Sequence, residues 1–196
     1  MNLWRNLLGK KDPQKKEEAQ SPFLPKQKDP IEIEFVKNFT RHGGRFIFVE
    51  SQEMLFNSFE NILKENTWEP KHICCLHKDL AQYFNISTSE EFTNRQQYSA
   101  LLTTCESLIA NKGGFLVCQH QIKNIKLKEL PEYIIVFATL NQLTSDVSEA
   151  MSILKQKYDG ALPTNITNLS VKNETKDKQS LTQGSNAKNI YLLLQE

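Results

Sequence analysis

The alternation of apolar and polar positions becomes regular from residue 31 onward. Apolar residues recur at helical spacing over 31–39, and Gly43-Gly44 follows where a helix would stop. The run 46–49 is short, apolar and β-prone, and Ser51 is placed to cap a further helix with Leu55 and Phe59 on one face. This part of the chain therefore predicts a helix, a strand and a second helix.

The same alternation continues to the end of the chain. A continuous apolar run over 133–139 is typical of a strand covered on both faces, and the stripe of Val147, Met151 and Leu154 predicts a helix over 144–158. The remaining expected strands are 72–76, 99–102, 115–118, 164–169 and 190–194, with a short helix over 80–84. Strands alternating with helices predict an α/β fold with a mostly parallel sheet flanked by helices.

Residues 1–30 differ in composition from the rest. Leu3, Trp4, Leu7 and Leu8 share one face of a short amphipathic segment, and a polar stretch with lysines and prolines follows it. Such a stripe can attach a protein to a partner or a membrane surface, or can fold back on its own domain. We expect an N-terminal segment and linker over 1–30 and one α/β domain over 31–196.

Composition limits the function classes. Hydrophobic residues make up 39% and charged residues 24% of the 196 residues, and the formal net charge is +1. A protein that binds nucleic acid through many phosphates needs clustered excess lysine and arginine, so nucleic acid is not expected as a partner. The chain also lacks a signal peptide's apolar core and any run of about 18 apolar residues, which predicts a cytoplasmic protein without a membrane span.

Two glycine-containing segments precede apolar strands and offer free backbone amides with one lysine each. They are Asn111-Lys112-Gly113-Gly114 and Gly184-Ser185-Asn186, the latter followed by Lys188. Backbone amides in small-residue turns suit a carboxylate or a phosphate, although a glycine turn is also ordinary loop chemistry. We expect these residues to bind a small anionic ligand.

The same residues carry a resemblance to the LUD (lactate-utilisation) domain family. The segment 108–117 resembles the family's Ile-Ala-Glu-Thr-Gly-Thr motif and its following strand, and 130–136 is similar to its Leu-Pro motif with a valine-rich strand. The segment 184–190 resembles the closing Gly-Pro-Ser-Arg-Thr-Ala-Asp-Ile-Glu signature. Order and spacing agree over 31–196.

The resemblance, to the lactate-utilisation protein C group in particular, implies a fold like that of the phosphosugar isomerases and CoA transferases. It also implies an accessory role in lactate utilisation beside an iron–sulfur oxidoreductase subunit, which would hold the redox centre. Asn111-Lys112 stands where the family often has Glu-Thr or Asp-Thr, and Asn186 or Ala187 and Asn189 stand where it has arginine and aspartate. A family activity that needs those groups is not implied for this chain, whereas ligand binding through backbone amides, Ser185, Asn186 and Lys112 would survive.

An enzymatic alternative depends on Glu106, which follows a predicted strand. The resemblance implies a fold like that of the CoA transferases, which use a glutamate nucleophile, so Glu106 is the candidate catalytic residue. The enzyme would then be of the isomerase or transferase type and would act on a phosphorylated or CoA-linked substrate. His72, Cys74, Cys75 and His77 alternate between the two faces of a strand and cannot converge on one metal. No nucleotide-binding glycine motif or closely spaced cysteine set occurs, so we expect no metal and no cofactor.

Overall fold

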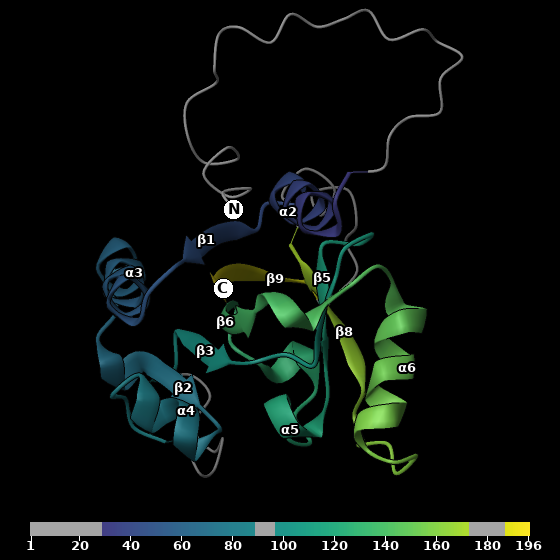
Figure 1. Ribbon diagram of the computed structural model, residues 1–196. Coiled ribbons are helices and arrows are strands. Elements are labelled where there is room, and N and C mark those ends of the chain that lie inside the picture. The colour runs from purple at the N-terminus through teal and green to yellow at the C-terminus, as the bar shows by residue number, and fades with distance from the viewer. Residues whose placement is uncertain (1–28, 89–96, 173–186) are drawn as a thin grey trace, which may run out of the picture.

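A computed structural model describes residues 29–88, 97–172 and 187–196 (Figure 1). The helices are α2 (Ile31–Arg41), α3 (Gln52–Glu65), α4 (Lys78–Tyr83), α5 (Gln119–Ile122) and α6 (Val147–Lys157), with 3-10 turns η1 (Pro70–His72), η3 (Leu127–Glu129) and η4 (Leu140–Gln142). The strands are β1 (Arg45–Val49), β2 (Ile73–Cys75), β3 (Ala100–Thr103), β4 (Ser107–Ile109), β5 (Gly114–Val117), β6 (Tyr133–Thr139), β7 (Leu143–Thr144), β8 (Thr167–Val171) and β9 (Ala187–Gln195). Within these ranges no helix combines the length and apolar character needed to cross a bilayer.

One half of the sheet is entirely parallel. The strand order β2-β3-β6-β9 is extended by β1, which pairs with the second half of β9 from Arg45↔Tyr191 to Val49↔Gln195. β6 and β9 pair over seven residues, from Tyr133↔Asn189 to Thr139↔Gln195. All five strands therefore end on the same edge of the sheet.

The other half of the sheet contains antiparallel pairs. β8 is parallel to the start of β9 at Ser170↔Ala187, but β5 is antiparallel to both β8 and β4. The short strand β7 then adds to β4 in parallel. The fold is thus mixed α/β with a mostly parallel sheet, which confirms the predicted class.

Alternating side chains of the parallel strands divide the core into two layers. On one face, α3 and α4 pack on residues that include Cys75, Leu102 and Leu193. On the other face, α2 and the antiparallel strands share a cluster with Cys74, Leu101 and Leu192. A third, smaller cluster lies beneath α6, at the far side of the molecule from α3 (Figure 1).

Most of the predicted elements occur, with shifted ends. Ser51 Oγ accepts a hydrogen bond from the Met54 amide and caps α3 as expected, and Asp146 caps α6 in the same way. The strand expected over 164–169 lies at Thr167–Val171 instead. The prediction missed β4, β7 and α5, each of four residues or fewer, because such short elements carry no readable periodicity.

The β4–β5 turn packs closely against α2. Phe39 of α2 stacks with Phe35 at 5.6 Å between ring centroids and meets Phe115 of β5 edge-on at 5.5 Å. Asn38 Nδ2 donates a 2.8 Å hydrogen bond to the Ala110 carbonyl. Gly113 has φ +57°, and a Cβ there would lie 2.3 Å from the Phe39 amide nitrogen. Only glycine allows the turn and the helix to come this close.

We therefore expect Gly113→Ala to lower the free energy of unfolding more than Gly160→Ala does. Gly160 also has a positive φ, +79°, but a Cβ there meets nothing within 4 Å, so it measures the conformational cost alone. The clash with the α2 backbone should add about 1–3 kcal/mol at Gly113. Urea unfolding of both variants measures the difference. Equal losses would contradict the packing of the turn on α2.

Candidate functional site

The carboxyl ends of the parallel strands form the candidate site. β2 ends at Cys75, β3 at Thr103, β6 at Thr139 and β9 at Gln195, so the residues at and just beyond these ends gather at one edge. Open parallel sheets bind ligands at this edge, because the loops that follow the strands leave a hollow there. The first polar residues at these ends are therefore the ones that a ligand would meet.

A cavity of about 650 Å³ opens at this edge, and we call it the crevice. Its lining combines polar groups with an apolar wall: His77, Lys78, Asp79, Leu80, Tyr83, Thr104, Phe137, Thr139 and Gln195. Lys78 and Asp79 are exposed and supply one charge of each sign, and Thr104 and Thr139 supply hydroxyl groups. The volume suits a small organic ligand.

His77 lies between the crevice and the protein interior. Its Nε2 atom is buried and makes no hydrogen bond within the described residues. Burial lowers the pKa of His77, and a contact with the Gln121 backbone opposes this only in part. The imidazole is therefore neutral at physiological pH, when it can either donate or accept one further hydrogen bond.

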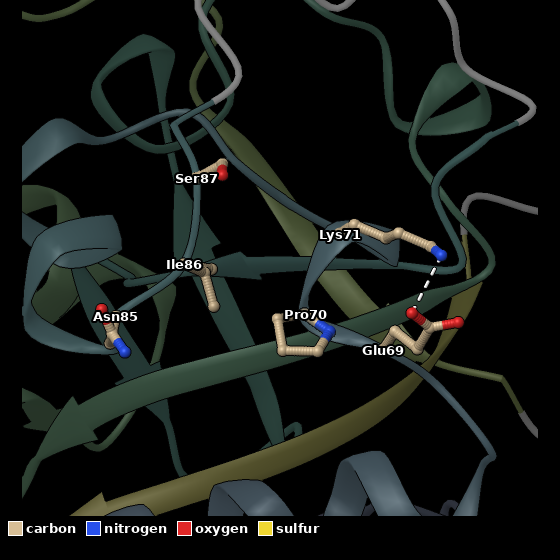
Figure 2. Close-up of a pocket in the computed structure, with 6 residues that line it drawn as sticks. All are labelled: Glu69, Pro70, Lys71, Asn85, Ile86 and Ser87. Atoms are coloured by element: carbon tan, nitrogen blue, oxygen red, sulfur yellow. Dashed lines mark ion pairs between the residues drawn. The ribbon is translucent and has the colours of Figure 1, made fainter.

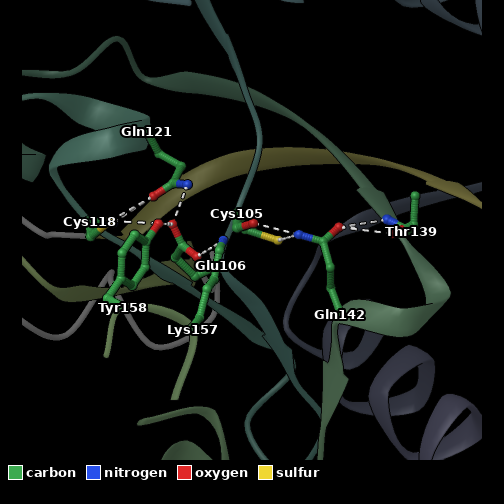
Figure 3. A network of polar contacts seen from close by, with 8 residues as sticks. All are labelled: Cys105, Glu106, Cys118, Gln121, Thr139, Gln142, Lys157 and Tyr158. Carbon is green, nitrogen blue, oxygen red and sulfur yellow. Dashed lines mark hydrogen bonds and ion pairs between the residues drawn. The ribbon is translucent and has the colours of Figure 1, made fainter. Parts of the chain in front are cut away.

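Glu106 follows the crevice residue Thr104 by two positions and is the centre of a polar network (Figure 3). Its Oε2 accepts from Lys157 Nζ at 2.7 Å. Its Oε1 accepts from Gln121 Nε2 at 2.9 Å and from the Tyr158 hydroxyl at 3.1 Å. The Cys118 thiol also points at Oε1, at 3.5 Å. Both carboxylate oxygens are thus engaged by donors.

The network keeps Glu106 ionised although its side chain is only 2% exposed. Burial opposes ionisation, but the hydrogen bonds from Lys157, Gln121 and Tyr158 outweigh it and hold the pKa of Glu106 below its usual value. The pKa values of the neighbouring thiols are shifted upward instead, because burial raises the pKa of Cys118 to about 11 and raises the pKa of Cys105 further. These cysteines are therefore protonated at neutral pH.

Gln142 fixes the spacing between two strand ends. Its side-chain oxygen accepts from the Thr139 amide at 2.8 Å, and its side-chain nitrogen donates to the Cys105 carbonyl (Figure 3). The end of β6 is in this way tied to the segment that follows β3. Thr104 and Thr139, which line the crevice from these two strands, are held at a set separation.

The sequence-predicted ligand residues lie elsewhere. Asn111 and Lys112 are exposed in the β4–β5 turn, while Gly113 and Gly114 are buried. Gly184, Ser185 and Asn186 lie outside the described residues, but Ala187, which follows them, begins β9. Phe115 follows the first segment and pairs with Leu169 of β8, and Ala187 follows the second segment and pairs with Ser170 of β8. The residues that follow the two segments are therefore paired with neighbouring positions of β8. They lie near the amino end of β9, opposite the crevice.

The adjacent cysteines of β2 lie on opposite faces of the sheet. Cys74 belongs to the core on one face and Cys75 to the core on the other, as the alternation of a strand requires. In the described ranges, no three residues among His, Cys, Asp and Glu are grouped so that they could hold a metal ion.

The sequence prediction missed His77, Thr104, Thr139 and Gln195 as site residues. No spacing links them, because each comes from a different part of the chain. The available signal was that each lies at, or within two residues of, the end of a parallel strand.

Comparisons with known proteins agree with this architecture. A family model described as "LUD domain" matches residues 90–194, more than half of the chain. A crystal structure titled as a DUF162 family protein from Deinococcus radiodurans at 1.70 Å resolution is similar with a TM-score of 0.59, covering 85% of this chain and 96% of that one. At 14% identity this likeness shows a shared fold alone. The comparison with curated proteins finds no significant match.

The Glu106 network predicts a pH-dependent contribution to stability. Because folding lowers the pKa of Glu106, its ionised form stabilises the folded state above the unfolded pKa of about 4.3, and this is lost as pH falls through the folded pKa. Glu106→Gln should cost about 2 kcal/mol at neutral pH, chiefly through the disrupted hydrogen bonds. The difference from wild type should shrink below about pH 4.

Denaturant unfolding across this pH range measures the effect. Glu60→Gln is the matched control, since Glu60 forms an exposed ion pair with Lys64 at 3.4 Å that should contribute little. A loss at Glu106 no larger than that at Glu60, or one that stays constant into acid, would be inconsistent with a buried, ionised Glu106.

Proposed function

Because the chain belongs to the LUD domain family, we propose that it is an accessory, ligand-binding component of lactate utilisation that holds a small anionic 2-hydroxy acid. The observation that carries this proposal is the crevice at the carboxyl ends of the parallel strands, lined by one cation, one carboxylate and two threonine hydroxyls. The likeness to phosphosugar isomerases and CoA transferases stays an expectation from the resemblance.

The crevice matches both functional groups of a 2-hydroxy acid. Lys78 and the Thr104 hydroxyl can donate to its carboxylate, while Asp79 can accept from its hydroxyl group; the Thr139 hydroxyl already donates to the Asn141 side chain. Hydrogen bonds to a charged partner contribute about 1.5–3 kcal/mol each, and Lys78 and Asp79 are exposed. Binding should therefore be of micromolar to millimolar strength.

The environment of Glu106 favours a binding role over the enzymatic alternative. A carboxylate nucleophile must reach its substrate, but Glu106 is enclosed and both of its oxygens already accept hydrogen bonds. We assign it instead to positioning: Gln121 contacts both Glu106 and His77, so the network supports the crevice wall. In this proposal an iron–sulfur partner subunit supplies any redox chemistry.

Two further parts of the proposal rest on the sequence. The first is the division into an N-terminal segment over 1–30 and a domain over 31–196, with the segment as a candidate attachment to the partner. The second is the anion site formed by Asn111–Gly114 with Gly184, Ser185 and Asn186. It competes with the crevice as the place where the ligand binds, and one titration separates the two.

L-lactate titrated into the ¹⁵N-labelled full chain should shift the amide signals of Lys78, Thr104 and Thr139. Lys78→Ala should weaken binding about tenfold, since it removes one charged hydrogen bond. Lys64→Ala, an exposed lysine on α3 that does not line the crevice, is the matched control. Lys112→Ala should leave the affinity unchanged.

Shifts centred on Asn111 to Gly114, with a loss of affinity in Lys112→Ala, would move the site to the predicted turn. If neither lactate nor a longer 2-hydroxy acid produces a shift at millimolar concentration, the proposed function is wrong.

A further inference from the structure

A second hollow on the α3–α4 face adjoins the crevice at Tyr83, and we call it the aromatic groove. It has a volume of about 380 Å³ and lies between the two helices. Its lining is mostly apolar: Phe56, Phe59, Glu60, Leu63, Pro70, Tyr83, Phe84, Asn85 and Ile86. Tyr83 lines both the crevice and the groove, so the two are neighbours across a single side chain.

Tyr83 contacts aromatic rings on both sides. Its ring centroid lies 6.0 Å from that of Phe137, which lines the crevice, and 5.4 Å from that of Phe56, which lines the groove. The Tyr83 side chain is at the surface, 36% exposed as a residue. A ligand that occupied both hollows would therefore pass over the exposed part of Tyr83 at the surface.

The far end of the groove becomes polar. It shares Pro70, Asn85 and Ile86 with a third hollow of about 480 Å³, which is also lined by Glu69, Lys71 and Ser87 (Figure 2). Glu69 and Lys71 form an ion pair at 2.9 Å there. An apolar chain gains little by entering a hollow lined by polar groups, so the apolar lining ends at Pro70 and Ile86.

We infer that the natural ligand is a 2-hydroxy acid longer than lactate, with its carboxylate in the crevice and an unbranched hydrocarbon tail in the aromatic groove. The inference rests on the proposed function for the position of the head group. An acid as small as lactate leaves most of the crevice and all of the groove empty, whereas ligand sites are usually filled by what they bind. The mostly apolar lining of the groove fits a hydrocarbon tail, which forms no hydrogen bonds.

The test is the dependence of affinity on chain length. Dissociation constants are measured by calorimetry for L-lactate and for unbranched 2-hydroxy acids of increasing length, each below its micelle concentration. Affinity should rise by up to about fourfold for each methylene that becomes fully buried. The rise should level off when the tail reaches the polar hollow.

Two variants of α3 locate the tail. Glu60→Trp places an indole in the groove and should abolish the dependence on chain length while lactate binds as in wild type. Asn61→Trp is the control, because Asn61 is exposed on the same helix and lines none of the three hollows. It should keep the full dependence.

The outcomes separate this inference from the proposed function. If lactate binds and the longer acids bind no more tightly, the crevice is a site but the groove is not part of it, and the inference fails alone. A chain-length dependence that Glu60→Trp leaves unchanged also overturns it, since the tail then lies elsewhere. If no acid binds, both the proposed function and the inference fail.

Discussion

The structure depends on the pairing of β9 along both of its edges. Seven of its nine residues, Asn189 to Gln195, pair with β6 on one side, while β8 and β1 pair with separate parts of the other side. Five consecutive positions of β9, Ile190 to Leu194, are buried, so both faces of the strand are covered by the core. A strand bonded on both edges and buried on both faces fixes the direction of its neighbours. The common carboxyl edge of β1, β2, β3, β6 and β9 follows from it.

At that edge, which carries the candidate site, polar side chains hold the loops in place. Gln142 ties the end of β6 to the segment after β3, and the Glu106 network attaches the same segment to α5 and α6 through Gln121 and Lys157. An ionised carboxylate in the interior is tolerated only because every oxygen has donors. The antiparallel half of the sheet therefore does more than enlarge the core: it carries the helices that keep Glu106 charged and the crevice wall ordered. The β4–β5 turn at Gly113, in contrast, packs directly against the backbone of α2.

The hydrophobic pattern predicted the long helices, each of which buries one face, and the long central strand. The stripes of α2, α3 and α6 and the continuous apolar run of β6 were long enough to show which faces are covered. Strands β4 and β7 were missed because three residues or fewer carry no period, and β7 pairs with a strand far away in sequence, at Leu108↔Leu143. For the site, Glu106 was recognised as a candidate, but Lys157 and Tyr158 lie about fifty residues away and only folding brings them to it. The crevice escaped prediction for the same reason, since its polar groups are single residues at the ends of separate strands.

A crystal structure of the full chain grown with L-lactate in excess tests the central claim most directly, because it shows where the anion lies without relying on any variant. The account predicts density for the acid in the crevice, with its carboxylate within hydrogen-bond distance of Lys78 Nζ and the Thr104 hydroxyl. Density at the β4–β5 turn beside Lys112, with the crevice holding only water, would contradict the claim that the carboxyl edge set by β9 is the ligand site.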